Sequence, residues 1–333
     1  MTPLLEVEDL VVEMRRHGAA FRAVDGVSFS LERGGALAIV GESGCGKSIT
    51  LRAIMDLLPS GGRLVSGRVV VDGVELEADN RGRGRGHHQR ERMSIIFQDA
   101  LSALNPVATV GNQIAEAPRH VLALGRNASR ERAIELLRLV GIPDPERRYH
   151  AYPHELSGGT RQRVMIAIAL SSEPAILLCD EPTTALDVTI QTQILALLCE
   201  LREARGLSLV FVTHDLSVVS QVAEQLAVMY TGRLVETGPT EIVLGAPRHP
   251  YTAGLLGAAL DVDTPEREPI AIPGSIPDPL RLPSGCTFHP RCRFATPDCV
   301  TTDVRLEPVG PDQEAACLHS DALAAALADA GRD

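Results

Sequence analysis

The sequence predicts an α/β fold with a largely parallel central sheet, followed by a loop-rich C-terminal region. Up to about residue 240, short apolar runs of strand length alternate with amphipathic helical segments. One glycine-rich segment lies between such a run and a helix, as phosphate-binding loops do. From about residue 245 the composition changes and prolines become dense between Pro265 and Pro297, so we expect a separate module there rather than more sheet.

Four apolar runs have the length and composition of buried strands. They are Ala36–Val40, 93–97, 176–179 and 207–212. Helices are expected at 49–57, 129–141, 162–171 and 189–205. Ser129 has the character of an N-cap, and Gly141 and Gly206 are expected to end their helices. The Gly/Arg-rich segment 80–92 has no apolar period and is expected to be a solvated surface loop.

The bulk composition excludes some classes of protein. The formal net charge is −11, which disfavours general binding of nucleic acid through a basic surface. No apolar run approaches the roughly 18 residues of a membrane-spanning helix. The first residues, MTPLLEVEDL, lack the basic start and apolar stretch of a signal peptide. We therefore expect a cytoplasmic chain that reaches a membrane only through partner proteins.

The first motif that carries chemistry is GESGCGKS, which fits G-x-x-x-x-G-K-[ST]. Its glycines let backbone N–H groups turn inward around phosphates, and the helix that follows adds its positive end. We expect Lys47 to reach the β- and γ-phosphates of ATP and Ser48 to ligate Mg²⁺. The expected ATP-binding residues are Gly41, Glu42, Ser43, Gly44, Cys45, Gly46, Lys47, Ser48 and Ile49.

The second motif is ILLCDEP, in which an expected strand delivers two carboxylates at its end. Ligands bind at that end of the strands in open α/β sheets. Asp180 is expected to hold the Mg²⁺ shell, and Glu181 to polarise the attacking water as a general base.

The third motif is LSGGTRQR, which precedes an expected helix and lies roughly twenty residues before the acidic pair. Alone, Ser-Gly-Gly is only a turn. In this order the chain resembles the ABC ATPase family, whose signature motif reads LSGGQ, with Thr160 at the fifth position here. The resemblance implies that the signature residues cap the γ-phosphate of ATP held by another subunit. These residues are Ser157, Gly158, Gly159 and Gln162.

The same resemblance implies roles for further positions. Gln98 matches the Q-loop glutamine, which contacts Mg²⁺ and the attacking water, in a loop that also touches membrane subunits. Asp187, with Ala185 and Leu186, matches the D-loop at the dimer seam, and His214 matches the switch histidine that bonds the γ-phosphate. Phe21 lies where an aromatic residue would stack on adenine, although an ordinary core role fits it equally well.

Within the family, the chain resembles the ATP-binding subunits of bacterial oligopeptide/dipeptide importers. The matching segments are FRAVDGVSFSL, FQDALSALNP, DEPTTALDVTIQ and APRHPYT. Cys45 and Thr160 depart from the commonest pattern without removing a catalytic group. The resemblance implies an ABC ATPase domain at 1–244, with a helical subdomain at about 99–172, and an importer-type extension at 245–333.

The implied partners are a second ABC ATPase subunit (a copy or a paralogue), two transmembrane permease subunits and, indirectly, an extracytoplasmic substrate-binding protein. The implied location is the cytoplasmic face of the cell membrane, and no nucleic acid is expected. A nickel importer of the same subfamily remains an alternative. A soluble ABC protein of translation or DNA repair is disfavoured, because such proteins usually carry two motif sets or a long coiled coil. A P-loop kinase is disfavoured because it would lack the LSGG signature. An exporter motor is disfavoured because it would lack this C-terminal extension.

Four of the seven cysteines crowd the C-terminal region: Cys286, Cys292, Cys299 and Cys317. Their spacing includes no C-x-x-C pair, which a structural zinc site usually shows. Four thiolates also suit an iron–sulfur cluster. Some peptide-importer subunits carry a [4Fe–4S] cluster in this extension, so the resemblance favours a cluster over zinc or buried reduced thiols. His289 and His319 are expected to face solvent.

Overall fold

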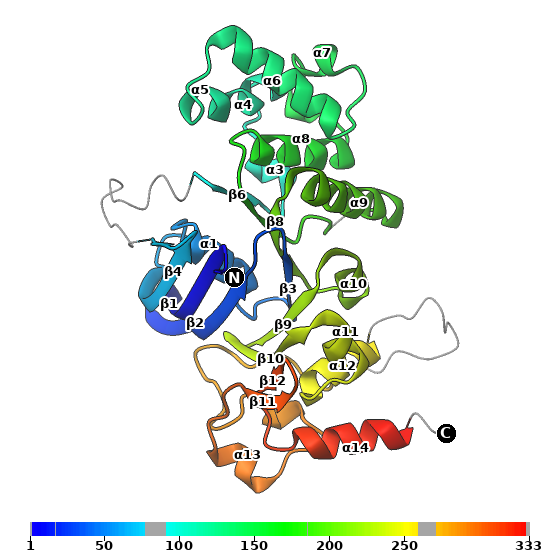
Figure 1. Ribbon diagram of the computed structural model, residues 1–333. Coiled ribbons are helices and arrows are strands. Elements are labelled where there is room, and N and C mark those ends of the chain that lie inside the picture. The colour runs from blue at the N-terminus through cyan, green and yellow to red at the C-terminus, as the bar shows by residue number, and fades with distance from the viewer. Residues whose placement is uncertain (1, 17, 77–90, 185, 259–270, 331–333) are drawn as a thin grey trace. The chain divides into compact units, whose positions relative to one another are not determined.

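A computed structural model describes residues 2–16, 18–76, 91–184, 186–258 and 271–330 (Figure 1). The chain forms two compact units. The first contains residues 1–31, 36–78 and 212–333, and the second contains residues 32–35 and 79–211. Most of the Gly/Arg-rich segment 80–92 lies outside the described residues, as does Ala185, so the surface loop stays a prediction.

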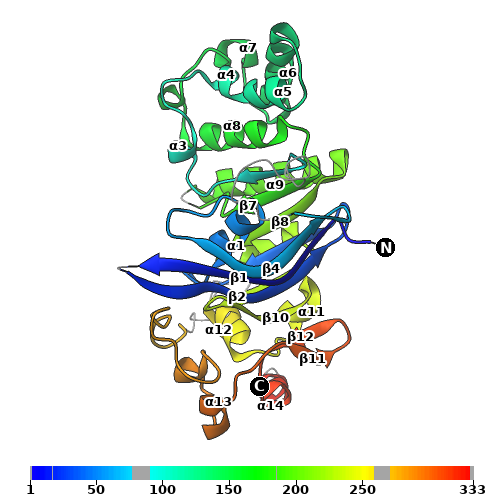
Figure 2. The same ribbon diagram turned by 90° about the vertical axis from the view of Figure 1, so that its left-hand side faces the viewer.

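The first unit contains a four-stranded antiparallel sheet in the order β2-β1-β4-β5. Its strands are β1 (Leu5–Arg16), β2 (Ala19–Leu31), β4 (Arg63–Val71) and β5 (Val74–Glu75). Figure 2 shows β1, β2 and β4 side by side. None of these strands was among those expected from the sequence. The alternation of apolar residues in β1 breaks between Val7 and Leu10, where the register shifts and Asp9 has a φ of 46°.

A second run of strands in the first unit has the order β11-β12-β10-β9-β3. β3 (Ala36–Val40) pairs in parallel with β9 (Gln225–Tyr230), and all five residues of β3 are buried. The remaining pairs are antiparallel, through β10 (Arg233–Pro239), β12 (Gln313–Ala315) and β11 (Glu307–Gly310). The expectation of no further sheet beyond residue 245 is therefore wrong, because β11 and β12 are too short to show an apolar period.

Helices of the first unit follow its strands. They are α1 (Lys47–Ile54), α10 (Val219–Val222), α11 (Thr240–Gly245), α12 (Pro250–Ala258), α13 (Pro297–Thr301) and α14 (Ser320–Ala330), with 3-10 turns η2 (Leu216–Val218) and η3 (His289–Arg291). The helix predicted at 49–57 exists as α1, but it begins two residues earlier. Lys47 and Ser48 therefore lie in its first turn.

The second unit contains the strand order β8-β7-β6. β6 (Met93–Ile96) and β7 (Ile176–Asp180) are parallel, and β8 (Ser208–Thr213) extends by its last two residues into the first unit. Every residue of β7 and β8 is buried, which explains their nearly continuous apolar sequence. The strands predicted from the apolar runs at 93–97, 176–179 and 207–212 are confirmed to within one residue at each end.

Helices make up the rest of the second unit. They are α3 (Ala100–Ala103), α4 (Val110–Ile114), α5 (Glu116–His120), α6 (Arg126–Leu139), α7 (Pro145–Arg148), α8 (Gly158–Leu170) and α9 (Val188–Arg205), with the 3-10 turn η1 (Pro153–Glu155). α3, α4 and α6 pack on α8, and Figure 1 shows this cluster. No helix in the described part of the chain is long and apolar enough to cross a membrane.

Gly141 and Gly206 are confirmed as the residues that end α6 and α9, but the expected start of α6 is wrong. α1 also ends at Ile54 rather than at residue 57, and α8 begins at Gly158 rather than at residue 162. Gly141 and Gly206 follow α6 and α9 with φ values of 72° and 63°. Ser129 does not cap α6, because the helix begins after Gly125. The Ser129 hydroxyl instead donates to the carbonyls of Leu124 and Gly125, 3.2 and 3.0 Å away.

Candidate functional site

The loop between β3 and α1 has a backbone that only glycine permits at two points. A Cβ on Gly41 would lie 2.2 Å from the Met229 carbonyl oxygen. Gly46 has a φ of 115°, and its Cβ would lie 2.4 Å from the Ala23 carbonyl oxygen. The Cys45 carbonyl accepts the Gly232 N–H at 2.7 Å, which ties the loop to the turn after β9. These contacts fix a tight turn of the kind that cradles phosphate.

Lys47 lies across this loop. The residue is 4% exposed, and its ammonium group donates to the carbonyls of Gly41 and Glu42, at 2.6 and 3.2 Å. Ser43 and Gly44, in contrast, are exposed. Burial raises the pKa of the Cys45 thiol, so this side chain is neutral at pH 7. The loop therefore presents a buried cation and an exposed stretch of backbone at the start of a helix.

The acidic pair lies at the end of β7, and the structure joins one of its members to Gln98. Glu181 is 6% exposed and has a φ of 47°, a conformation uncommon for a residue with a side chain. The Gln98 amide donates to Glu181 Oε2 at 3.3 Å, and the Thr184 hydroxyl donates to the same oxygen at 2.8 Å. Asp180, one residue earlier, is 1% exposed. The Glu181 carboxylate is thus held by two neutral donors and remains an acceptor.

The signature segment forms the N-terminus of α8. Ser157 is the N-cap, and its oxygen accepts the Thr160 N–H at 3.4 Å. Ser157 and Gly158 are exposed, whereas a Cβ on Gly159 would lie 2.8 Å from Ile190 Cγ2 on α9. Gln162 is buried, and its Nε2 has no hydrogen-bond partner among the described residues. An exposed helix start of this kind favours anions.

The other predicted positions are placed as follows. Asp187 caps α9 by accepting the Ile190 N–H at 2.9 Å, a role that the sequence analysis missed. His214 is exposed directly after β8. Phe21 is half-buried in β2, where it pairs with Met14 of β1, and its stacking role stays a prediction. The phosphate-binding loop, Phe21 and His214 belong to the first unit, and the other described residues predicted for the ATP site belong to the second.

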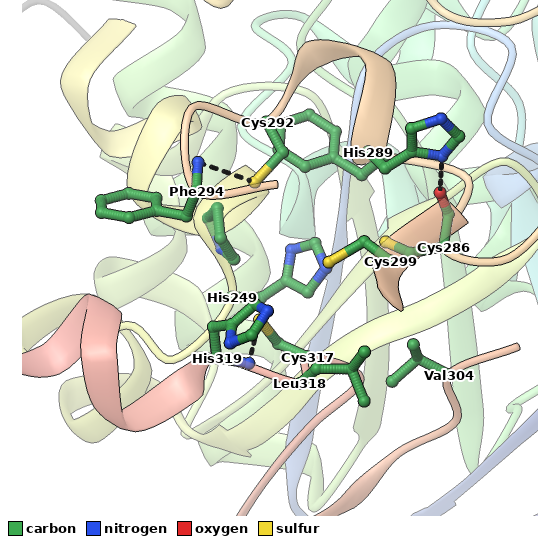
Figure 3. A pocket seen from close by; sticks show the side chains of 12 residues that line it. His249, Cys286, His289, Cys292, Phe294, Cys299, Val304, Cys317, Leu318 and His319 are labelled. Carbon is green, nitrogen blue, oxygen red and sulfur yellow. Dashed lines mark hydrogen bonds between the residues drawn. The ribbon is translucent and has the colours of Figure 1, made fainter. Parts of the chain in front are cut away.

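The four clustered cysteines line one cavity of the first unit (Figure 3). None of them forms a disulfide. Cys292 and Cys317 each accept the backbone N–H of the residue two positions later, at 3.4 Å. The Thr296 hydroxyl lies 3.6 Å from Cys299 Sγ. Three histidines also line the cavity: His249, His289 and His319.

Burial raises the pKa of three of these thiols, Cys286, Cys292 and Cys317, the last to about 11. They are therefore protonated unless a cation is bound. Among the described residues, no three His, Cys, Asp or Glu side chains are grouped to hold a metal ion. The expectation that His289 and His319 face solvent is wrong: both are half-buried, bonded to the Cys286 carbonyl and the Thr296 hydroxyl, each at 2.9 Å.

Sequence reasoning missed two residues that contact the phosphate-binding loop. The Tyr251 hydroxyl accepts the Glu42 N–H at 2.8 Å, and the Arg291 guanidinium binds the Glu42 carboxylate at 2.7 and 3.1 Å. Tyr251 lies in the segment APRHPYT, which was notable only as a mark of resemblance. The contacts span 209 and 249 residues of sequence, and no local pattern indicates them.

Comparisons with known protein families agree with the family assignment made from the order of the motifs. The profile of the family described as "ABC transporter" matches residues 24–184, and that described as "Oligopeptide/dipeptide transporter, C-terminal region" matches residues 235–299. The chain is 42% identical to the dipeptide transport ATP-binding protein DppD of Escherichia coli over 329 residues, which cover 99% of the chain and 98% of that protein.

It is also 47% identical over 326 residues, or 96% of the chain, to the oligopeptide transport ATP-binding protein OppD of Mycobacterium bovis. The match covers 52% of that relative, so the chain spans about half of its length.

Two solved structures share the fold. One is cbiO1 of Clostridium perfringens, part of the ABC transporter complex cbiONQ, with a TM-score of 0.62 and 28% identity over 74% of this chain and 92% of that one. The other is an ATP-binding cassette bound to ADP and phosphate in a post-hydrolysis state, with a TM-score of 0.61 and 26% identity over 71% of this chain and 98% of that one. The predicted α/β nucleotide-binding fold is confirmed.

Proposed function

The chain belongs to the ABC transporter family, among the ATP-binding subunits with the oligopeptide/dipeptide C-terminal region, and from this we propose that it hydrolyses ATP to power a bacterial importer of di- and oligopeptides. The observation that carries the proposal is the Glu181 carboxylate at the end of β7, held by Gln98 and Thr184. A buried carboxylate that accepts hydrogen bonds from neutral donors suits a general base.

ATP would be bound as its Mg²⁺ complex. The backbone of 43–48 and the start of α1 would receive the phosphates, and Lys47 would offset their charge. Ser48, Asp180 and Gln98 would hold Mg²⁺, which would stabilise the charge of the phosphates. Glu181 orients and deprotonates the attacking water, and His214 donates to the γ-phosphate. Catalysis is then positioning plus stabilisation of the charge that develops in phosphoryl transfer.

A second ATPase subunit, either a copy or a paralogue, completes each site. The motif set occurs once in the chain, and the signature lies at an exposed helix start. Ser157, Gly158, Gly159 and Gln162 would meet the γ-phosphate bound by the partner, with Asp187 at the seam. ATP would close the pair and turn the permease outward, and hydrolysis would reset it.

The proposed organisation is an ABC ATPase domain at 1–244, with its helical subdomain at about 99–172, and an importer-type extension at 245–333. Attachment to the cytoplasmic face of the cell membrane would occur through two permease subunits, fed by an extracytoplasmic substrate-binding protein, without nucleic acid. Peptides are favoured as cargo because of the C-terminal match and the names of the relatives. Nickel is the other cargo to test.

The cysteine cavity is proposed to hold a [4Fe–4S] cluster. Four thiols from separate segments line one space, and the sulfurs of Cys292, Cys299 and Cys317 have a hydrogen-bonding neighbour of the kind that tunes cluster thiolates. When bound, the cluster would tie together the segments that carry the four cysteines.

Uptake by living cells tests the proposed cargo. Cells that lack the gene should lose uptake of a radiolabelled dipeptide, regain it with the wild-type chain, and fail to regain it with Glu181→Gln. Uptake of radiolabelled nickel should stay unchanged throughout. Loss of nickel uptake with normal peptide uptake would replace the peptide assignment by the nickel one. No change in either would contradict an importer role for these two solutes.

A further inference from the structure

Glu42, in the phosphate-binding loop, is bonded through both its backbone and its side chain. Its N–H donates to the Tyr251 hydroxyl at 2.8 Å, and its carbonyl accepts from Lys47 at 3.2 Å. Its carboxylate accepts two hydrogen bonds from Arg291, at 2.7 and 3.1 Å. The loop motif allows any residue at this position. The structure nevertheless fixes the backbone and the side chain of Glu42 at the same time.

Two of these partners come from the region after residue 245. Tyr251 lies in α12, and Arg291 ends η3. We propose that Tyr251 and Arg291 are positioning residues of the phosphate-binding loop, which hold Glu42 so that the amides beyond it are set for phosphate. This inference rests on the proposed ATP-binding function and extends it, because it makes nucleotide affinity depend on the C-terminal region.

The bidentate ion pair between Arg291 and Glu42 lies in a largely buried position. The Arg291 side chain is 4% exposed and the Glu42 side chain 31% exposed. Two parallel N–H···O bonds fix the orientation of a carboxylate, which a single ammonium does not. The ion pair can therefore hold Glu42 in one position.

An aromatic cluster holds both positioning residues rigid. The rings of Tyr230, Tyr251 and Phe288 have centroids 4.6 to 5.4 Å apart. The Arg291 guanidinium lies 5.9 Å from the ring centroids of Tyr230 and Phe288, and its Nε donates to the Pro273 carbonyl at 2.9 Å. Both positioning residues are thus packed against several neighbours besides the loop.

The same cluster borders the cysteine cavity. Phe288 lines that cavity, and Cys292 directly follows Arg291 in the chain. On the other side, His249 lines the cavity while its Nδ1 accepts the Tyr251 N–H at 3.0 Å. Each positioning residue therefore lies next to a residue of the cavity wall.

The test measures ATP affinity and thermal stability in parallel on the full chain. Tyr251→Phe removes one oxygen and keeps the ring, and Arg291→Met removes the charge and keeps much of the length. Arg305→Met is the matched control, because Arg305 belongs to the same region and contacts Asp25 and Asp303 instead of the loop. Calorimetric titration with Mg²⁺–ATP gives Kd, and a melting curve reports folding.

We expect Tyr251→Phe to weaken ATP binding about 3- to 10-fold and Arg291→Met about 10-fold or more, with Arg305→Met unchanged. Arg291→Lys should restore affinity only in part. Adding Glu42→Gln to Arg291→Met should weaken binding no further, because both act through one pair. That lack of additivity is a result that a general loss of stability would not produce.

Wild-type affinity in both Tyr251→Phe and Arg291→Met, even with lowered melting temperatures, would overturn the inference and leave the proposed function intact. A wild-type chain that fails to bind ATP would instead reject the proposed function and this inference together. If Arg291→Met does not fold, Tyr251→Phe decides the question, since it removes one hydroxyl and no packing.

Discussion

The side-chain amide of Gln98 donates a hydrogen bond to Glu181 Oε2 across 3.3 Å. The two residues lie 83 positions apart and follow neighbouring parallel strands, β6 and β7. Thr184 donates to the same oxygen, so that oxygen has two fixed neighbours. A carboxylate with a fixed orientation can direct one lone pair at a water, which is what a general base requires.

Replacing Glu181 by Gln should abolish most ATP turnover while ATP still binds. The amide keeps the shape of the side chain but does not accept a proton, and loss of a general base lowers rates by about 10²- to 10⁴-fold. Phosphate release by the assembled complex and Kd for ATP are the measurements. Glu173→Gln is the control, because Glu173 pairs with Arg132 at the surface. Turnover at the wild-type rate in Glu181→Gln would remove Glu181 from this role.

Ser157→Ala should separate the two halves of the shared site. The variant loses the cap of α8, which costs about 1 kcal/mol of stability, and the hydroxyl that would face the partner's γ-phosphate. ATP binding to the single subunit should be unchanged, because the phosphate-binding loop is intact, whereas turnover by the complex should fall. Thr160→Ala is the matched comparison, since it keeps the capping N–H and removes only the hydroxyl near Ser157. Equal turnover in the two variants would contradict a role in trans.

Asp25→Asn should destabilise the chain at neutral pH but not in acid. Burial raises the pKa of the Asp25 carboxyl, but hydrogen bonds and charge from Arg22 and Arg233 outweigh it and hold the pKa below its usual 3.8. The carboxylate therefore contributes stability above about pH 4, and that contribution is lost as the pH falls through the lowered pKa.

The expected difference in the free energy of unfolding is about 1–3 kcal/mol at pH 7, shrinking below pH 4. Urea titrations at pH 7 and pH 3 measure it. Asp303→Asn, at a more exposed partner of Arg233, should lose less. A deficit in Asp25→Asn that stays constant between the two pH values would show that packing, not charge, is responsible.

The cysteine cavity makes a spectroscopic prediction. Purified without oxygen, the chain should be brown and carry about four irons, and Cys292→Ser should lose colour and iron. Cys199→Ser is the control, because Cys199 lies in α9 of the other unit. A colourless protein with one zinc, or with no metal, would reject the cluster and leave the argument for ATP hydrolysis untouched.

The sequence was sufficient where the relevant physics is local. The strand β3, the glycine turn and the first turn of α1 are neighbours in sequence, so one motif predicts their arrangement. β7 could be predicted equally well, because a strand that is buried on both faces is apolar along most of its length. Gly141 and Gly206 marked helix ends through the backbone freedom that each end requires.

The sequence was insufficient where a contact crosses much of the chain or a period is broken. The bulge in β1 interrupts the alternation that would have revealed the N-terminal sheet. β12 is three residues long and shows no pattern, yet it pairs with β10. The partners of Glu42 could not be predicted from the sequence, because an ion pair produces no periodic pattern of residues in either segment.

The 249 residues that separate Glu42 from Arg291 also set an order of events during synthesis. The second unit is nearly continuous at 79–211, so its contacts can form while the chain is still emerging from the ribosome. The phosphate-binding loop has emerged by then but lacks its contact with Arg291. At about 5–20 residues per second, Arg291 follows Glu42 by roughly 12–50 s. The nucleotide site is therefore translated early, but its last contact forms late. A ribosome that stalls before codon 291 leaves a chain that has every ATPase motif and lacks the ion pair between Arg291 and Glu42.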